Sequence, residues 1–183
     1  MAITHRIGGV LLALALTPSA AACTATPVPT PTVTLTPSQS PTAATLSPAE
    51  QDLENAKQAV VKLWAVVDRL TNDPKSSIQD LDAVASGQVL TMLQENLMTY
   101  RAQRWTGSGS AIVTPESAKS AGTNARGYAT WTVTACVDRS HTTLVDTKGK
   151  SVQLPPYRIR HRSTVVQRSA SLYVDHDEAL GTC

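Results

Sequence analysis

The sequence contains few aromatic, charged and cysteine residues, and each scarcity narrows the class of protein. Among its 183 residues Phe is absent, aromatic residues account for 4% and charged residues for 16%. A chain of this length supports about one domain with a modest core, which excludes a multidomain machine. The net charge of +2 is far from the basic balance of a dedicated nucleic-acid-binding protein, so we expect no nucleic-acid partner.

Recognisable catalytic and metal-binding motifs are also missing. The sequence has no Gly-Xaa-Ser-Xaa-Gly nucleophile elbow, no phosphate-binding loop and no zinc-type spacing of Cys and His. We therefore assign no catalytic residue, no metal ligand and no cofactor. An enzyme is the less favoured class.

The amino-terminal segment is typical of a signal peptide. Arg6 precedes an apolar run at positions 7–16, which is well short of the roughly 20 residues that a membrane-spanning helix needs. Small residues follow as far as Ala22. This layout predicts a signal peptide at residues 1–22.

The stretch Ala20-Ala21-Ala22-Cys23 resembles a bacterial lipobox, with Ala20 where Leu is usual. The resemblance implies that the Cys23 sulfur carries a diacylglycerol with acyl chains such as palmitate. Two acyl chains suffice for stable anchoring, which places the protein on the extracytoplasmic face of the cell membrane. The same small residues fit the ordinary secretory peptidase, so a secreted protein is the alternative.

The segment 23–47 is a linker by composition. The 24 residues after Cys23 include eight Thr, five Pro and three Ser, and none is charged. Such a segment buries too little apolar surface to offset the entropy of ordering it. We expect a disordered stalk, stiffened by Pro, between the anchor and a folded domain at 48–183.

The folded domain begins with helices. Ser47-Pro48-Ala49-Glu50 is a capping-box signature, and apolar residues then recur at steps of three and four until Asn72. This pattern predicts a long first helix. A short second helix is expected at 77–85, ending near Gly87, and a third at 88–104.

Strands are expected after Trp105, where Gly, Ser, Thr and β-branched residues replace the helical spacing. The expected strands are 110–118, 125–138, 144–145, 151–152, 157–167 and 171–175. Helices followed by meandering strands define an α+β fold. We expect three amino-terminal helices packed on a strongly bent, cone-like antiparallel sheet of about four to six strands.

Two cysteines remain in the domain when Cys23 is set aside. Cys136 lies near the end of the long strand and Cys183 is the last residue. An even pair in an oxidising compartment is expected to form a disulfide. Two free thiols in metal or redox chemistry are the alternative, although neither has a Cys or His at the spacing that such chemistry uses.

Several motifs of the domain together resemble one family. They are the strand end Val133-Thr134-Ala135-Cys136-Val137-Asp138, the turn Val145-Asp146-Thr147-Lys148-Gly149, the basic strand after Pro155-Pro156, and the final Gly181-Thr182-Cys183. They resemble uncharacterised actinobacterial and actinophage lipoproteins with the cone-shaped fold of the nuclear transport factor 2 superfamily. The resemblance covers residues 48–183 and implies a fold rather than an activity. Leu172-Tyr173 stands where that family usually has Trp.

Enzymes of that superfamily use Tyr, Asp or His inside the cone as general acids or bases. Four such residues fall on expected strands: Tyr128, Asp138, Tyr157 and His161. The sequence does not give their direction, and we interpret each as a half-exposed polar strand residue. The cluster at 175–178 (Asp, His, Asp, Glu) has donor atoms for a divalent ion, but adjacent strand residues point to opposite faces. We interpret it as a solvated terminal segment.

A basic stripe is the least ordinary feature. Arg158, Arg160 and Arg162 alternate and therefore share one face of a strand. Residues 48–118 carry six basic and nine acidic side chains, whereas 119–183 carry nine and five. The stripe is a candidate contact for an envelope protein, an anionic cell-wall polymer or lipid headgroups. The alternative is an exposed face that prevents edge pairing and complements the acidic helices.

These observations favour a membrane-tethered extracytoplasmic lipoprotein that acts as a non-enzymatic interaction or scaffolding module at the cell envelope. A small-ligand-binding or enzymatic cone domain is the alternative, which requires an apolar pocket with one or two converging ionisable groups. A phage-encoded or defensive surface protein is a further possibility.

Overall fold

The computed structural model describes residues 46–153 and 155–183. The predicted signal peptide, the Cys23 anchor and the linker up to residue 45 lie outside the described residues. In the described part, no helix has the length and hydrophobicity to cross a membrane.

Three helices come first, as predicted. Helix α1 (Pro48–Asn72) begins at the expected capping box: the Ser47 hydroxyl accepts from the Glu50 N–H, and the Glu50 carboxylate accepts from the Ser47 N–H at 2.8 Å. The short 3₁₀ helix η1 (Ile78–Ala83) follows, and then helix α2 (Gly87–Ala102).

Gly87 opens α2 and does not end the second helix, which corrects the prediction. Its φ is +54°, a conformation that Gly adopts readily. A Cβ at this position would also lie 2.7 Å from the Asp175 carboxylate. Gly is therefore favoured here both by the positive φ and by the close approach of the Asp175 side chain.

The strands form two antiparallel sheets, which confirms the α+β class. The larger sheet has the order β2-β3-β5-β6, and β1 pairs with β4 in a two-stranded sheet. The strand bounds are β1 Thr106–Ser108, β2 Ile112–Thr123, β3 Ala129–Asp138, β4 Thr143–Val145, β5 Arg158–Arg168 and β6 Ser171–Thr182. The sequence did not predict β1, and it ended the last strand seven residues too early.

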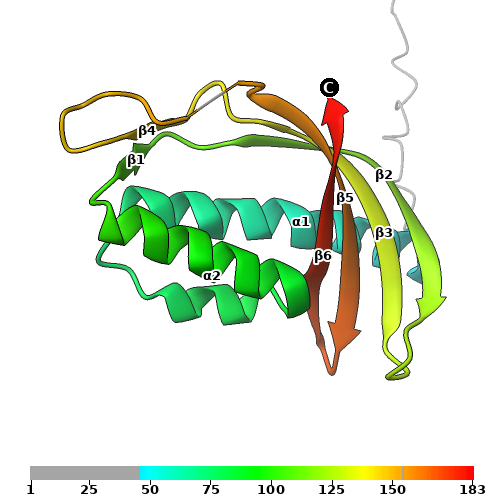
Figure 1. Ribbon diagram of the computed structural model, residues 1–183. Helices are drawn as coiled ribbons and strands as arrows, with labels where there is room; N and C mark the ends of the chain where they lie inside the picture. The colour runs from blue at the N-terminus through cyan, green and yellow to red at the C-terminus, as the bar shows by residue number, and fades with distance from the viewer. Residues whose placement is uncertain (1–45, 154) are drawn as a thin grey trace, which may run out of the picture. The chain divides into compact units, whose positions relative to one another are not determined.

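The helices cover one face of the four-stranded sheet (Figure 1). Alternate residues of β3 point to that face, and Trp131, Val133 and Ala135 pack with Val60 and Leu63 of α1 in the buried core. This core occupies the middle of the domain. It leaves space at each end between the helices and the sheet.

Cys136 and Cys183 form a disulfide, as expected from the sequence, with an S–S distance of 2.02 Å. The bond attaches the last residue of the chain to β3. Because β6 carries residues of the site described below, the disulfide also restrains one wall of that site.

Candidate ligand-binding site

The three arginines of the basic stripe all have acidic partners on other strands of the same sheet. Arg160 makes a two-point contact with Glu116, with Nε 2.8 Å from Oε2 and Nη2 3.1 Å from Oε1. Arg158 lies 3.5 Å from Asp138 and Arg162 lies 3.3 Å from Glu178. The hydrogen bond from Arg160 lowers the pKa of Glu116. The partners lie on strands, not on the acidic helices that the sequence suggested.

On the helix-facing side of the same strand, β5 contributes a polar cluster that the sequence did not reveal. His161 Nδ1 lies 2.6 Å from Asp177 Oδ2, and the Ser163 hydroxyl donates to Asp177 Oδ1 at 2.6 Å. The side chains of His161 and Asp177 are only 12% and 11% exposed. Strand pairing sets this geometry, because Ser163 lies directly opposite Asp177.

The Asp177 carboxylate also fixes the state of the His161 ring. An ionised carboxylate only accepts hydrogen bonds, so Nδ1 of His161 carries the proton that is donated to it. In the neutral ring, Nε2 is then left with a lone pair. The edge of the His161 ring also packs against Trp64 of α1, with ring centroids 5.5 Å apart.

This cluster lines a cavity of about 120 Å³ between α1, α2 and the sheet. Its walls are mainly apolar. The residues from α1 and α2 that line it are Leu63, Trp64, Val67, Thr71, Val89, Met92, Leu93, Asn96, Leu97 and Tyr100. The sheet side supplies His161, Asp177 and Arg139. Together with Tyr100 of α2, these are the ionisable side chains among the lining residues.

A second acidic group lies near this end of α1. Burial raises the pKa of Asp68, and the hydrogen bond from the Ala111 N–H and the charge of Arg139 partly offset that effect. The Ala111 nitrogen lies 2.7 Å from Asp68 Oδ2. Arg139 therefore lines the cavity and also interacts electrostatically with Asp68.

The structure brings one of the four acid–base candidates into the cavity. His161 points into it, so its interpretation as an ordinary half-exposed strand residue is wrong. Asp138 pairs with Arg158 on the other face, and Tyr128 lies beside Arg168, whose guanidinium carbon is 5.8 Å from the ring centroid. Tyr157 is an exposed residue just before β5.

The interpretation of the cluster at 175–178 as a solvated terminus is also wrong. These residues lie inside β6, where Asp177 binds His161 and Ser163, and Asp175 accepts from Ser86 at 2.7 Å and Arg168 at 2.9 Å. The two residues that alternate with them, His176 and Glu178, are exposed. Within the described residues, no group of three or more His, Cys, Asp or Glu side chains could hold a metal ion.

The sequence did hold a signal for His161. The alternation that puts Arg158, Arg160 and Arg162 on one face puts His161 and Ser163 on the other, together with apolar Val165. Only a buried face combines these residue types. The partner Asp177 depends on the register of β5 with β6, which the sequence does not fix.

The fold and the cavity together define a small α+β domain with a small, mainly apolar cavity between its helices and its sheet. The chain matches no family model, and no curated protein matches it. Among solved structures it is similar to the crystal structure of the intermembrane space region of the chloroplast protein ARC6. That likeness has a TM-score of 0.52 and 14% identity, and it covers 72% of this chain and 98% of the other. At this identity it shows the fold alone.

Proposed function

We propose that this protein is a lipid-anchored, extracytoplasmic binding protein, and that its folded domain holds a small, largely apolar molecule with one polar group. The observation that carries the binding function is the His161–Asp177 pair in the wall of an otherwise apolar cavity. Apolar walls with a few converging polar groups are the usual lining of a small-molecule site, and this cavity is smaller than the roughly 300–1,000 Å³ of sites for drug-sized ligands.

The cavity volume limits the ligand. An engineered apolar cavity of about 150 Å³ binds benzene, so the smaller space of about 120 Å³ here limits the ligand to at most about one six-membered ring. A second reactant would have no room beside such a ring. The volume therefore favours binding over a bimolecular reaction.

The polar groups define one end of the ligand. In the neutral ring, His161 Nε2 accepts a hydrogen bond from a ligand hydroxyl, because the contact with Asp177 places the ring proton on Nδ1. The Arg139 guanidinium lines the same wall and favours an electron-rich group. Phenol combines one ring with one hydroxyl and is the probe of choice.

Calorimetric titration of the Cys23→Ala chain with phenol tests the proposal. We expect saturable binding, and we expect Met92→Trp to abolish it because Met92 lines the cavity and is 36% exposed. Met98→Trp is the matched control on the same helix, since Met98 is 61% exposed and lies outside the lining. Equal binding by both variants, or none by the parent chain, contradicts the proposal.

A separate experiment tests the anchor. The proposal rests on the lipobox resemblance at Cys23 and predicts that labelled palmitate enters the mature protein in cells. A Cys23→Ala form should be released from the membrane fraction. Absence of label together with unchanged membrane association would contradict the anchor and leave the binding function to be judged separately.

Docking to an envelope protein is a second candidate function. Three large apolar side chains are between 39% and 52% exposed at one end of the sheet, where β2 and β5 begin and β6 ends: Ile112, Tyr157 and Leu180. Exposed apolar groups of this kind mark interaction sites when they form a patch. Replacing Ile112 and Leu180 by Ser should remove any cross-linked partner from envelope extracts, whereas Met98→Ser should not.

A further inference from the structure

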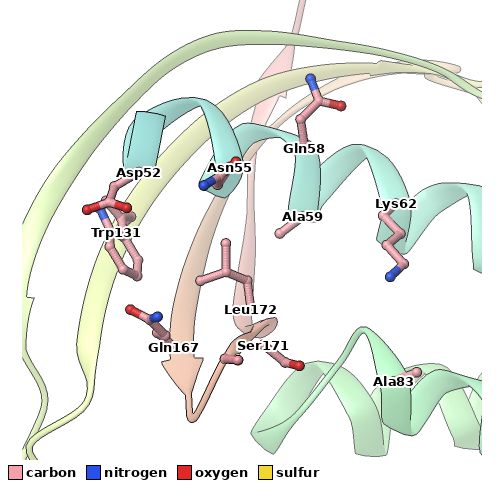
Figure 2. A pocket seen from close by; sticks show the side chains of 11 residues that line it. Asp52, Asn55, Gln58, Ala59, Lys62, Ala83, Trp131, Gln167, Ser171 and Leu172 are labelled. Carbon is pink, nitrogen blue, oxygen red and sulfur yellow. The ribbon is translucent and has the colours of Figure 1, made fainter. Parts of the chain in front are cut away.

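A polar cleft of about 390 Å³ lies at the opposite end of the helix–sheet layer from the cavity. It lies between the amino-terminal half of α1, helix η1 and the turn that joins β5 to β6 (Figure 2). The cleft and the cavity share no lining residue. Any ligand of the cleft is therefore independent of the proposed apolar ligand.

Polar side chains surround a small apolar floor in this cleft. Helix α1 supplies Asp52, Asn55, Gln58 and Lys62, and the β5–β6 end supplies Gln167 and Ser171. The floor is formed by Ala59, Leu172 and the edge of Trp131, which is 7% exposed. Figure 2 shows the amide groups of Asn55 and Gln167 on either side of this floor.

Four of these polar side chains have no partner among the residues that the structure describes. In the ranges 46–153 and 155–183, no hydrogen bond or ion pair engages the side chains of Asp52, Lys62, Gln167 or Ser171. The outer face of the sheet differs, because each arginine of its stripe has a carboxylate partner. Two further lining amides have partners on the exposed surface of α1, because Asn55 accepts from Gln51 at 3.0 Å and Gln58 donates to Glu54 at 3.1 Å, and each keeps further hydrogen-bonding capacity.

The charges at this cleft do not favour an ion of either sign. Asp52 and Lys62 are ten residues apart on one helix, a distance of about 15 Å along its axis, so they do not neutralise each other by contact. Their opposite signs give a lining with no net charge. The groups between them are amides, each with donors and an acceptor, together with one hydroxyl.

We propose that this cleft binds a short, neutral oligosaccharide. Sugar hydroxyls donate and accept, which matches the amides of Asn55, Gln58 and Gln167, and the C–H face of a sugar ring fits an apolar floor. The volume lies within the range of small-molecule pockets. An extended peptide fits less well, because its side chains need deep apolar pockets, and the apolar surface of this cleft is a small floor.

Titration by ¹⁵N–¹H NMR tests this assignment with maltotriose and chitotriose as probes. We expect at least one of them to shift the side-chain amide signals of Asn55 and Gln167 in the Cys23→Ala chain. The double variant Asn55→Ala with Gln167→Ala should weaken binding about tenfold or more. Gln103→Ala is the matched control, because Gln103 is an exposed amide at the end of α2.

The outcomes separate this site from the apolar cavity. Met92→Trp closes the cavity and should leave saccharide binding unchanged, whereas the double variant should leave phenol binding unchanged. The assignment is overturned if neither saccharide shifts the two amides, or if the double variant binds as well as Gln103→Ala. Binding of triglycine at these amides in place of the saccharides would identify a peptide site and would also overturn it.

Discussion

Asp177 and His161 are joined by a 2.6 Å hydrogen bond across the two strands that end the chain. The bond lies between the helix layer and the sheet, where water has little access, and the same carboxylate also accepts from Ser163. One acidic side chain therefore orients the imidazole of the site and satisfies a hydroxyl that is 1% exposed.

Asp177→Ala should destabilise the fold. The substitution leaves the His161 N–H and the buried Ser163 hydroxyl without an acceptor, at a cost of about 1–3 kcal/mol for such an unsatisfied group. Urea denaturation measures the loss. Glu178→Ala, one residue further along and exposed, should change the free energy of unfolding by less than about 0.5 kcal/mol. Equal effects of the two substitutions would show that the Asp177 contacts contribute nothing.

Reduction of the disulfide should lower stability more than any single side-chain change in the site. Cys136 and Cys183 are separated by 47 positions, for which loop-closure entropy predicts about 4 kcal/mol. Thermal unfolding with and without reductant measures this difference. A chain with both cysteines replaced by Ala should be less stable than the parent chain, and reductant should not change its stability. If reductant did destabilise this chain, the stability loss in the parent chain could not be assigned to the Cys136–Cys183 bond.

Asp68 should make stability fall as pH rises. Burial raises the pKa of Asp68 in the folded protein above the ordinary value that it has in the unfolded chain. At pH values between the pKa of Asp68 in the unfolded chain and its higher pKa in the folded protein, the folded state binds more protons than the unfolded state. Raising the pH through this range therefore lowers the stability of the fold. Asp68→Asn keeps an oxygen for the Ala111 N–H and removes the charge. The variant should therefore gain stability relative to the parent as pH rises from about 3 to 7.

Denaturation of both proteins across this pH range provides the measurement. Because other carboxylates are common to the two proteins, the difference between their unfolding free energies isolates Asp68. A difference that stays constant with pH would contradict the raised pKa. A variant that loses stability toward neutral pH would show that the attraction of Arg139 outweighs burial.

The stripe of Arg158, Arg160 and Arg162 should bind anionic membranes only weakly. Each guanidinium lies within 3.5 Å of a carboxylate, so a membrane would meet paired charges. We expect the triple Ala variant and the parent chain to cosediment equally with vesicles that contain anionic lipid. A salt-sensitive loss of binding in the triple variant would instead support the contact that the sequence suggested.

The sequence predicts the helices well because their signals are local. The capping box at Ser47–Glu50 and the apolar spacing that follows it lie within α1 itself, and its last residue, Asn72, matches the structure. The strand β1 has three residues and no alternation of its own, so it depends on pairing with β4. The predicted third helix begins at residue 88, within one residue of the start of α2 at Gly87.

The site was less predictable than the fold because it depends on register. The β5–β6 pairing shifts at Arg160/His161 and again at Thr164/Val165, and these shifts decide which β6 residues face the helices. A slip of one residue would turn Asp177 to the outer face. The alternation of the arginines predicts that His161 faces the helices, but it does not predict that Asp177 is its partner.

The most direct test of the ligand-binding account is an intermolecular nuclear Overhauser measurement on the Cys23→Ala chain with bound phenol. The account predicts contacts from the phenol ring to Leu97 and Trp64, and a hydroxyl directed at His161, which His161→Gln should weaken and His176→Gln should not. Contacts confined to the outer face of the sheet, or no contacts at saturating phenol, would contradict it.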